Sequence, residues 1–198
     1  MHGLRIVFLF LCLQMTQGCF RPRPNIDNDN DEPECPCIIS RAQWGARTAK
    51  GTTRMTSTPT YVVIHHGGVG SRCFKPEQCK EIVRNYQKYH MDTNEWDDIG
   101  YNFIVGEDGN VYEGRGWGLV GAHAPGFNSK SLGICVIGDF SKSVPNQAAQ
   151  NAVKDLISCS VARKKLSSSY RLRGHRDVKT TACPGTSFYN VIRTWKNY

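Results

Sequence analysis

Short runs of β-branched and aromatic residues alternate along this chain with turns rich in glycine, proline and polar residues. The first such run, Tyr61 to His65, is bounded by Pro59 and by Gly67, which is the pattern of a strand. By the same criteria, strands are predicted over residues 61–65, 101–105, 111–113, 131–137 and 170–173. The polar sequence Glu-Asp-Gly-Asn between the second and third of these strands predicts a hairpin.

Apolar residues at helical spacing predict three helices between and after those strands. The first begins at Pro76, because proline suits the first turn of a helix, and it runs to Met91. The second runs from Pro145 through Ala162, and the third follows Gly185. Their apolar faces consist of Ile82, Val83, Tyr86 and Tyr89, then Val153, Leu156, Ile157 and Val161, and finally Phe188, Val191, Ile192 and Trp195. Because strands and helices alternate, the predicted fold class is α/β, with a mixed central β-sheet flanked by about three α-helices.

Residues 1–18 have the composition of a signal peptide. They combine a basic residue, Arg5, with a short apolar run and with small residues at Thr16 and Gly18. A lipoprotein site at Cys19 is the alternative, but the residues before this cysteine fit such a site poorly. The apolar run is too short to span a bilayer, which needs about 20 residues. We therefore expect a secreted, extracellular protein with no transmembrane segment.

The next segment, residues 19–34, differs from the rest of the chain. It holds three prolines and five carboxylates and almost no apolar side chains. Such a segment cannot bury enough surface to offset its ordering entropy, so we expect a flexible acidic leader. Residues 35–198 then form one domain, which is long enough to bury a core.

The charge of the chain points to an anionic partner. The formal net charge is +8, and the domain is more basic still because the leader is acidic. Nucleic acid is disfavoured, since no dense stripe of lysine and arginine and no nucleic-acid motif accompany the charge. Anionic polymers of the bacterial wall match a secreted basic domain better. A monomer is the default expectation.

The cysteines fit an oxidising compartment. Seven of the nine remain when Cys12 and Cys19 are set aside. Most should pair, and an odd number leaves at least one outside the intramolecular bridges, as a metal ligand would be. Cys73 and Cys79, six residues apart, predict the closure of a small local loop. Cys135 lies in an apolar strand and is predicted to be a buried free thiol.

His65, His175 and Cys183 form a candidate metal site. His65 ends the first strand, and His175 follows the strand over 170–173. Strand ends are where α/β proteins commonly build their sites. Cys183 comes eight residues after His175 in a loop, so both side chains can reach one ion. Two imidazoles and a thiolate give Zn²⁺ three protein ligands and leave the fourth position open for water, which is the arrangement of a catalytic site.

Several long motifs follow one another along the domain in a fixed order. They are Ser-Arg-Ala-Gln-Trp-Gly-Ala at 40–46, Val-Ile-His-His at 63–66, Asp-Ile-Gly-Tyr-Asn-Phe at 98–103, Asp-Gly-Asn-Val-Tyr-Glu-Gly-Arg-Gly-Trp at 108–117, Gly-Ala-His at 121–123 and Gly-His-Arg-Asp at 174–177. On these motifs the chain resembles the peptidoglycan recognition protein family, which shares its fold with phage-type zinc amidases. The resemblance covers nearly all of residues 37–198.

The resemblance implies an activity. The family divides into zinc-dependent N-acetylmuramoyl-L-alanine amidases and receptors that bind the bacterial wall without cleaving it. In the amidases, zinc is held by residues that match His65, His175 and Cys183, and catalysis also uses residues that match Tyr101 and Thr181. Non-catalytic members typically lack the cysteine. Because this chain keeps all five positions, the resemblance implies a zinc amidase of innate immunity that hydrolyses the lactyl–L-alanine amide of peptidoglycan.

The resemblance also implies a substrate groove. His90 and His123 match positions that line it. Members that prefer diaminopimelate-type stem peptides tend to carry Gly-Trp where this chain has Glu95 and Trp96, and they place an arginine at the position of Arg115. A guanidinium can grip the extra carboxylate of diaminopimelate through two parallel hydrogen bonds. We therefore expect diaminopimelate-type peptidoglycan, although a carboxylate at residue 95 would repel the same ligand.

The family pattern of disulfides supports the bridge Cys73–Cys79 and implies a second bridge, Cys35–Cys159. Cys37 is then left over, joined to Cys135 or to another chain.

Two alternatives belong to other functional classes. The first is a recognition protein whose output is binding or bacteriostasis. The second is a disulfide-stapled binding module without metal, in which Cys183 would be oxidised.

Overall fold

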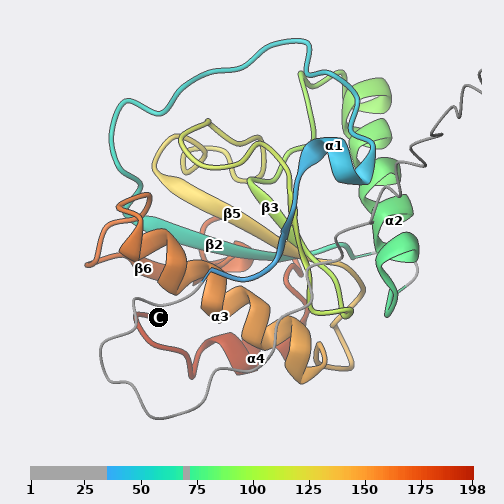
Figure 1. The fold of residues 1–198 in the computed structure, drawn as a ribbon. Coiled ribbons are helices and arrows are strands. Elements are labelled where there is room, and N and C mark those ends of the chain that lie inside the picture. Colours follow the sequence, from blue (N-terminus) through green and yellow to red (C-terminus); the bar gives the residue numbers. More distant parts are fainter. Residues whose placement is uncertain (1–34, 69–71) are drawn as a thin grey trace, which may run out of the picture. The chain divides into compact units, whose positions relative to one another are not determined.

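The computed structural model describes residues 35–68 and 72–198 (Figure 1). The predicted signal peptide over 1–18 and the acidic leader over 19–34 lie outside the described residues. Among the helices of the described part, none has the length and apolar character that crossing a membrane requires.

A mixed six-stranded sheet forms the centre of the described domain. Its strands follow the order β1-β4-β3-β5-β2-β6, and every pair is parallel except β3 with β4. The strands are β1 (Ile38–Ile39), β2 (Tyr61–His66), β3 (Phe103–Val105), β4 (Val111–Glu113), β5 (Ser131–Val136) and β6 (Arg171–Gly174). The predicted α/β fold class and the predicted hairpin are thereby confirmed.

The three predicted helices are present, with shifted ends. The helices are α1 (Arg41–Trp44), α2 (Pro76–Lys88), the π-helix η1 (Tyr89–Thr93), α3 (Gln147–Ala162), the 3-10 helix η2 (His175–Asp177) and α4 (Thr186–Ile192). The helix predicted to start at Pro145 starts two residues later, because the Asn146 side chain caps it by accepting a hydrogen bond from the backbone N–H of Ala149 at 2.9 Å. The strand predicted from Tyr101 starts at Phe103. The short elements β1 and α1 were not predicted.

Strand residues alternate between the two faces of the sheet. Val62 and Ile64 of β2, together with Leu132, Ile134 and Val136 of β5, are fully buried against α3 and α4. This alternation follows from the two-residue period of a strand. Figure 1 shows α3 and α4 on one side of the sheet and α2 on the other.

Helices cover only part of the opposite face of the sheet. Around Trp44, which is fully buried, α1 and α2 pack on residues of β3 and β4. Over β5 and β2 this face instead presents His65 and a row of small residues, Ser131, Gly133 and Cys135, which the register places beside β2. Small side chains leave room above the sheet at this place, and that is where the candidate site lies.

Two disulfides are formed among the described residues, Cys35–Cys159 and Cys73–Cys79, as predicted. Cys135 is a buried free thiol, also as predicted. The suggested bridge between Cys37 and Cys135 is wrong, since Cys37 is disulfide-bonded while Cys135 is free.

Removing the two bridges is expected to have unequal effects on stability. The bridge Cys35–Cys159 joins residues 124 apart, whereas Cys73–Cys79 joins residues 6 apart. Loop-closure entropy in the unfolded chain grows with loop length, so replacing both cysteines by alanine should lower the free energy of unfolding by about 5 kcal/mol for the long loop and about 2 kcal/mol for the short one. Urea unfolding of the two double variants measures both values, and equal losses would contradict the entropic argument.

Candidate metal centre and groove

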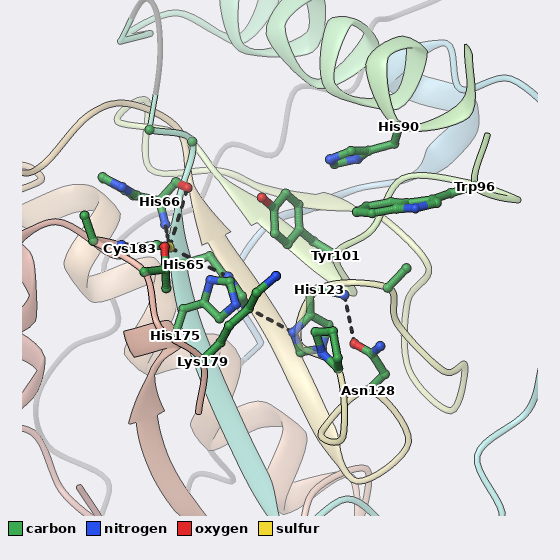
Figure 2. Close-up of a pocket in the computed structure, with 16 residues that line it drawn as sticks. His65, His66, His90, Trp96, Tyr101, His123, Asn128, His175, Lys179 and Cys183 are labelled. Atoms are coloured by element: carbon green, nitrogen blue, oxygen red, sulfur yellow. Dashed lines mark hydrogen bonds between the residues drawn. The ribbon is translucent and has the colours of Figure 1, made fainter. Parts of the chain in front are cut away.

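The structure brings His65, His175 and Cys183 together. One potential ligand atom of each residue lies within 4.8 Å of the others. His65 is the second-last residue of β2. His175 begins η2 directly after β6, and Cys183 lies in the loop that leads to α4. Because β2 and β6 are parallel neighbours, their carboxyl ends meet at one place on the sheet, and the loop then returns the thiol to it (Figure 2).

The contacts of these side chains define which atoms face one another. His65 Nδ1 lies 3.8 Å from Cys183 Sγ, while His65 Nε2 lies 3.0 Å from His123 Nδ1. The backbone N–H of His66 donates to Cys183 Sγ at 3.3 Å, an interaction that favours a thiolate. His65 therefore points its Nδ1 atom toward Cys183.

Burial keeps the two histidines of the candidate metal site neutral. Burial lowers the pKa of His65 well below its ordinary value, with neighbouring histidines adding to the effect, and it lowers the pKa of His175 to about 4. Burial also raises the pKa of the Cys183 thiol to about 12, so a cation must replace its proton before it can act as a thiolate at neutral pH.

The donor set fits a zinc ion. His175 Nε2 is buried and has no hydrogen-bond partner within the described part of the chain. An unpartnered buried nitrogen is costly unless a ligand satisfies it, and neutral imidazole is a preferred ligand of zinc. One imidazole nitrogen from each of His65 and His175 converges here with the sulfur of Cys183. This donor set matches a three-ligand catalytic zinc site and falls one ligand short of a closed structural one.

A groove of about 560 Å³ opens over the three candidate metal ligands. All predicted site residues except Arg115 line it: His65, His90, Trp96, Tyr101, His123, His175, Thr181 and Cys183. Figure 2 shows His90 and Trp96 on one side of this groove, away from His175 and Cys183, with Tyr101 between the two groups. The groove thus places a flat aromatic wall opposite the candidate metal ligands.

Tyr101 and Thr181 are the two predicted catalytic groups. The ring of Tyr101 lies 5.3 Å from that of His65 and 5.5 Å from that of His90, measured between centroids. Burial raises the pKa of the Tyr101 hydroxyl well above its ordinary value, so it remains a proton donor at neutral pH. Thr181 Oγ1 accepts a hydrogen bond from the backbone N–H of Cys183 at 3.2 Å, which leaves its own O–H available to donate.

His90 and Trp96 form the aromatic wall. Their rings are stacked, with centroids 4.8 Å apart and planes inclined by 24°. His90 Nδ1 accepts a hydrogen bond from the backbone N–H of Gly100 at 3.1 Å, and burial lowers the pKa of His90 to about 4. The wall is therefore uncharged at neutral pH.

Arg115 and Glu95 are placed differently from the other predicted groove residues. Arg115 donates from Nε to the Ile99 carbonyl and from Nη1 to the Val120 carbonyl, each at 2.9 Å, and lines a separate hollow beside Asp98. Its charge still adds to the effect of burial in lowering the pKa of His90 and of His123. Glu95 has φ 60°, a left-handed conformation that glycine adopts without strain, and its exposed side chain is not part of the groove lining.

Two further residues that line the groove, Lys179 and Asn128, were not predicted. Lys179 lies four residues after His175, and its charge helps to lower the pKa of that histidine after burial. Asn128 Oδ1 accepts hydrogen bonds from the backbone N–H groups of His123 and Ala124, both at 2.8 Å. The spacing of Lys179 within the His175–Cys183 loop was the only available signal for it.

Comparison with known proteins connects this geometry to a family. Residues 55–186 match the family model described as N-acetylmuramoyl-L-alanine amidase. Peptidoglycan-recognition protein SC2 of Drosophila simulans is 47% identical over 161 residues, which cover 81% of this chain and 87% of that protein. The chain belongs to the peptidoglycan recognition protein family.

Two further members are similar to this chain. A mouse protein named N-acetylmuramoyl-L-alanine amidase is 40% identical over 167 residues, which cover 83% of this chain and 32% of the mouse protein. The structure of a point mutant of Drosophila PGRP-LB in complex with tracheal cytotoxin superposes with a TM-score of 0.81 at 37% identity, covering 81% of this chain and 95% of that one. The predicted family of this chain is thereby confirmed.

Proposed function

We propose that this protein is a secreted zinc-dependent N-acetylmuramoyl-L-alanine amidase of innate immunity that binds bacterial peptidoglycan and hydrolyses its lactyl–L-alanine amide. The convergence of His65, His175 and Cys183 carries the proposal, since their ligand atoms lie within 4.8 Å of one another at the floor of an open groove. A family member of the receptor class would have no need of a three-ligand site with an open fourth position.

The similar proteins support both parts of the proposal. The mouse relative carries the name of the amidase, and the PGRP-LB structure holds tracheal cytotoxin. Secretion is supported by the disulfides Cys35–Cys159 and Cys73–Cys79, because disulfides persist in oxidising compartments.

The residues of this chain have separable roles in the proposed reaction. His65 Nδ1, His175 Nε2 and Cys183 Sγ would hold zinc, which supplies Lewis acidity and lowers the pKa of water toward about 7. Tyr101, which keeps its proton, would donate a hydrogen bond to the oxygen of the amide as negative charge develops on it, and Thr181 can add a second donor.

The groove also offers contacts for the rest of the substrate. The stacked pair His90 and Trp96 provides a flat apolar surface for a stem peptide or a sugar ring. Lys179, exposed at the groove, can pair with a carboxylate of the stem. Binding across this wall would orient the amide over the metal ligands.

We further propose a preference for diaminopimelate-type stems. Trp96 lines the groove, and the charge of Arg115 lies close enough to influence both His90 and His123. The Glu95 side chain, which could have repelled the extra carboxylate, is exposed and outside the groove lining.

The test is the release of free stem peptides from purified peptidoglycan of the diaminopimelate type and of the lysine type. We expect release from both with zinc present, faster from the diaminopimelate type, and loss of release with a chelator that zinc reverses. Full zinc occupancy without release from either wall would instead assign the protein to the receptors, and equal rates on both walls would refute the proposed preference.

A further inference from the structure

The imidazole of His123 lies in a space that two glycines keep open. The side chain of His123 belongs to the loop before β5 and is only 7% exposed. A Cβ atom at Gly133 would lie 2.3 Å from His123 Cδ2, and a Cβ atom at Gly121 would lie 2.4 Å from the same atom. Any larger residue at either position would displace the ring, so the fold is shaped around this imidazole.

A chain of hydrogen bonds fixes which nitrogen of His123 carries its proton. Ser131 Oγ donates to the Phe127 carbonyl at 2.7 Å and lies 3.5 Å from His123 Nε2. Because the only proton of the serine hydroxyl is used on that carbonyl, Oγ can only accept from the histidine. His123 Nε2 is then the protonated nitrogen, and His123 Nδ1 is left with a free lone pair.

That lone pair determines the state of His65. His123 Nδ1 lies 3.0 Å from His65 Nε2, so His65 must donate from Nε2. A neutral imidazole carries one proton, so His65 Nδ1 is the bare nitrogen, and it is the nitrogen that lies 3.8 Å from Cys183 Sγ. The backbone of His123 is held in turn by Asn128. Along this series of contacts, from the Phe127 carbonyl through Ser131, His123 and His65 to Cys183, each proton is therefore assigned to one donor and meets one acceptor.

We propose that His123 is a positioning residue that holds His65 in the tautomer and orientation that present Nδ1 to the metal. The inference rests on the metal site of the proposed function. Partners that bind the second nitrogen of a metal-ligating histidine typically change metal affinity by about 10–100-fold when they are removed. Ser131 and Gly133, the small residues of β5, serve the same end by orienting and accommodating His123.

His90 provides a matched control within the groove. It is a buried histidine of the same groove, but its Nδ1 accepts from the backbone N–H of Gly100 and its ring stacks on Trp96. Within the described part of the chain, His90 makes no hydrogen bond to His65, His175 or Cys183. A change at His90 can alter substrate binding without altering the metal ligands.

The experiment measures the zinc dissociation constant of the purified full chain by competition with a chromophoric chelator. His123→Ala should weaken zinc binding by about 10–100-fold. His123→Asn, whose Oδ1 can take the place of Nδ1 as an acceptor, should restore most of the affinity. His90→Ala should leave the zinc affinity as in the wild type. Unchanged affinity in His123→Ala, or the same loss in His90→Ala, would overturn the proposal.

A second measurement needs no variant and so does not depend on folding. Long-range ¹H–¹⁵N correlation spectra of the zinc-loaded wild type should show His65 and His123 both protonated at Nε2. Protonation of His123 at Nδ1 would overturn the proposal. The two failures are distinguishable, because a wild type that binds zinc but releases no stem peptide refutes the amidase while the affinities still test His123, and a wild type that binds no zinc refutes both.

Discussion

Replacing Cys183 by serine is expected to abolish the release of stem peptides while leaving peptidoglycan binding in place. The thiolate is the one anionic ligand of the proposed site, and a serine hydroxyl at this position would stay protonated and bind zinc poorly. The loss of activity should exceed the roughly 10–100-fold that is typical of removing an outer-shell partner of a metal ligand. The groove walls, formed by His90, Trp96 and Tyr101, do not depend on the sulfur.

The measurement pairs an assay of released stem peptides with a pull-down on insoluble peptidoglycan. Thr180→Ala is the matched control, since Thr180 is exposed in the same loop and is not part of the groove lining. It should keep both cleavage and binding. Cleavage by Cys183→Ser at the wild-type rate would show that the thiol is no ligand and would remove the basis of the proposed amidase.

Replacing Tyr101 by phenylalanine is expected to lower kcat by about 10²–10³-fold, which corresponds to about 2.7–4 kcal/mol of lost transition-state stabilisation. The phenyl ring can keep the contacts with His65 and His90, so only the hydroxyl is lost. Because that hydroxyl donates to charge that develops during the reaction, KM should change little. The raised pKa of Tyr101 also means that its ionisation should not limit the rate below pH 10.

Steady-state kinetics on a soluble muropeptide separate the two constants. Tyr170→Phe is a suitable control, because Tyr170 is a half-buried tyrosine directly before β6 that lines a separate hollow and not the groove. It should keep the wild-type kcat. A Tyr101→Phe variant with unchanged kcat and raised KM would show that the hydroxyl binds the ground state and takes no part in the chemical step.

Both predictions depend on a site built from distant segments. His65 and Cys183 are 118 residues apart in sequence, yet their side chains lie 3.8 Å apart between Nδ1 and Sγ. The parallel pairing of β2 with β6 and with β5 produces this proximity, because it sets the ends of three strands side by side. The groove is then the part of that face which α1 and α2 leave uncovered.

The local pattern of residues was sufficient to predict the strands and the longer helices. The runs around Val63 and Ile134 have the composition of buried strands, and the helix at Pro76 has both its start signal and its apolar face. Such features depend on neighbours in sequence. The motifs around His65, His175 and Cys183 also identified the family, which the match over residues 55–186 confirmed.

Other features depend on contacts between segments that are distant in sequence, so the sequence did not predict them. Arg115 was expected in the groove, but its guanidinium is bound by the carbonyls of Ile99 and Val120. The place of Cys37 in a disulfide likewise follows from distances that a sequence does not contain.

The sequence by itself indicated a candidate metal site and determined which segments form strands and helices, because residue type and spacing carry both kinds of information. Only the tertiary structure decided how the ligands are oriented. The orientation of His65 follows from its contact with His123, and the place of His123 depends on the space above Gly133 and on the hydroxyl of Ser131. The physical reason is that a hydrogen bond requires its two atoms to lie about 3 Å apart, and only the folded chain sets that distance for residues remote in sequence.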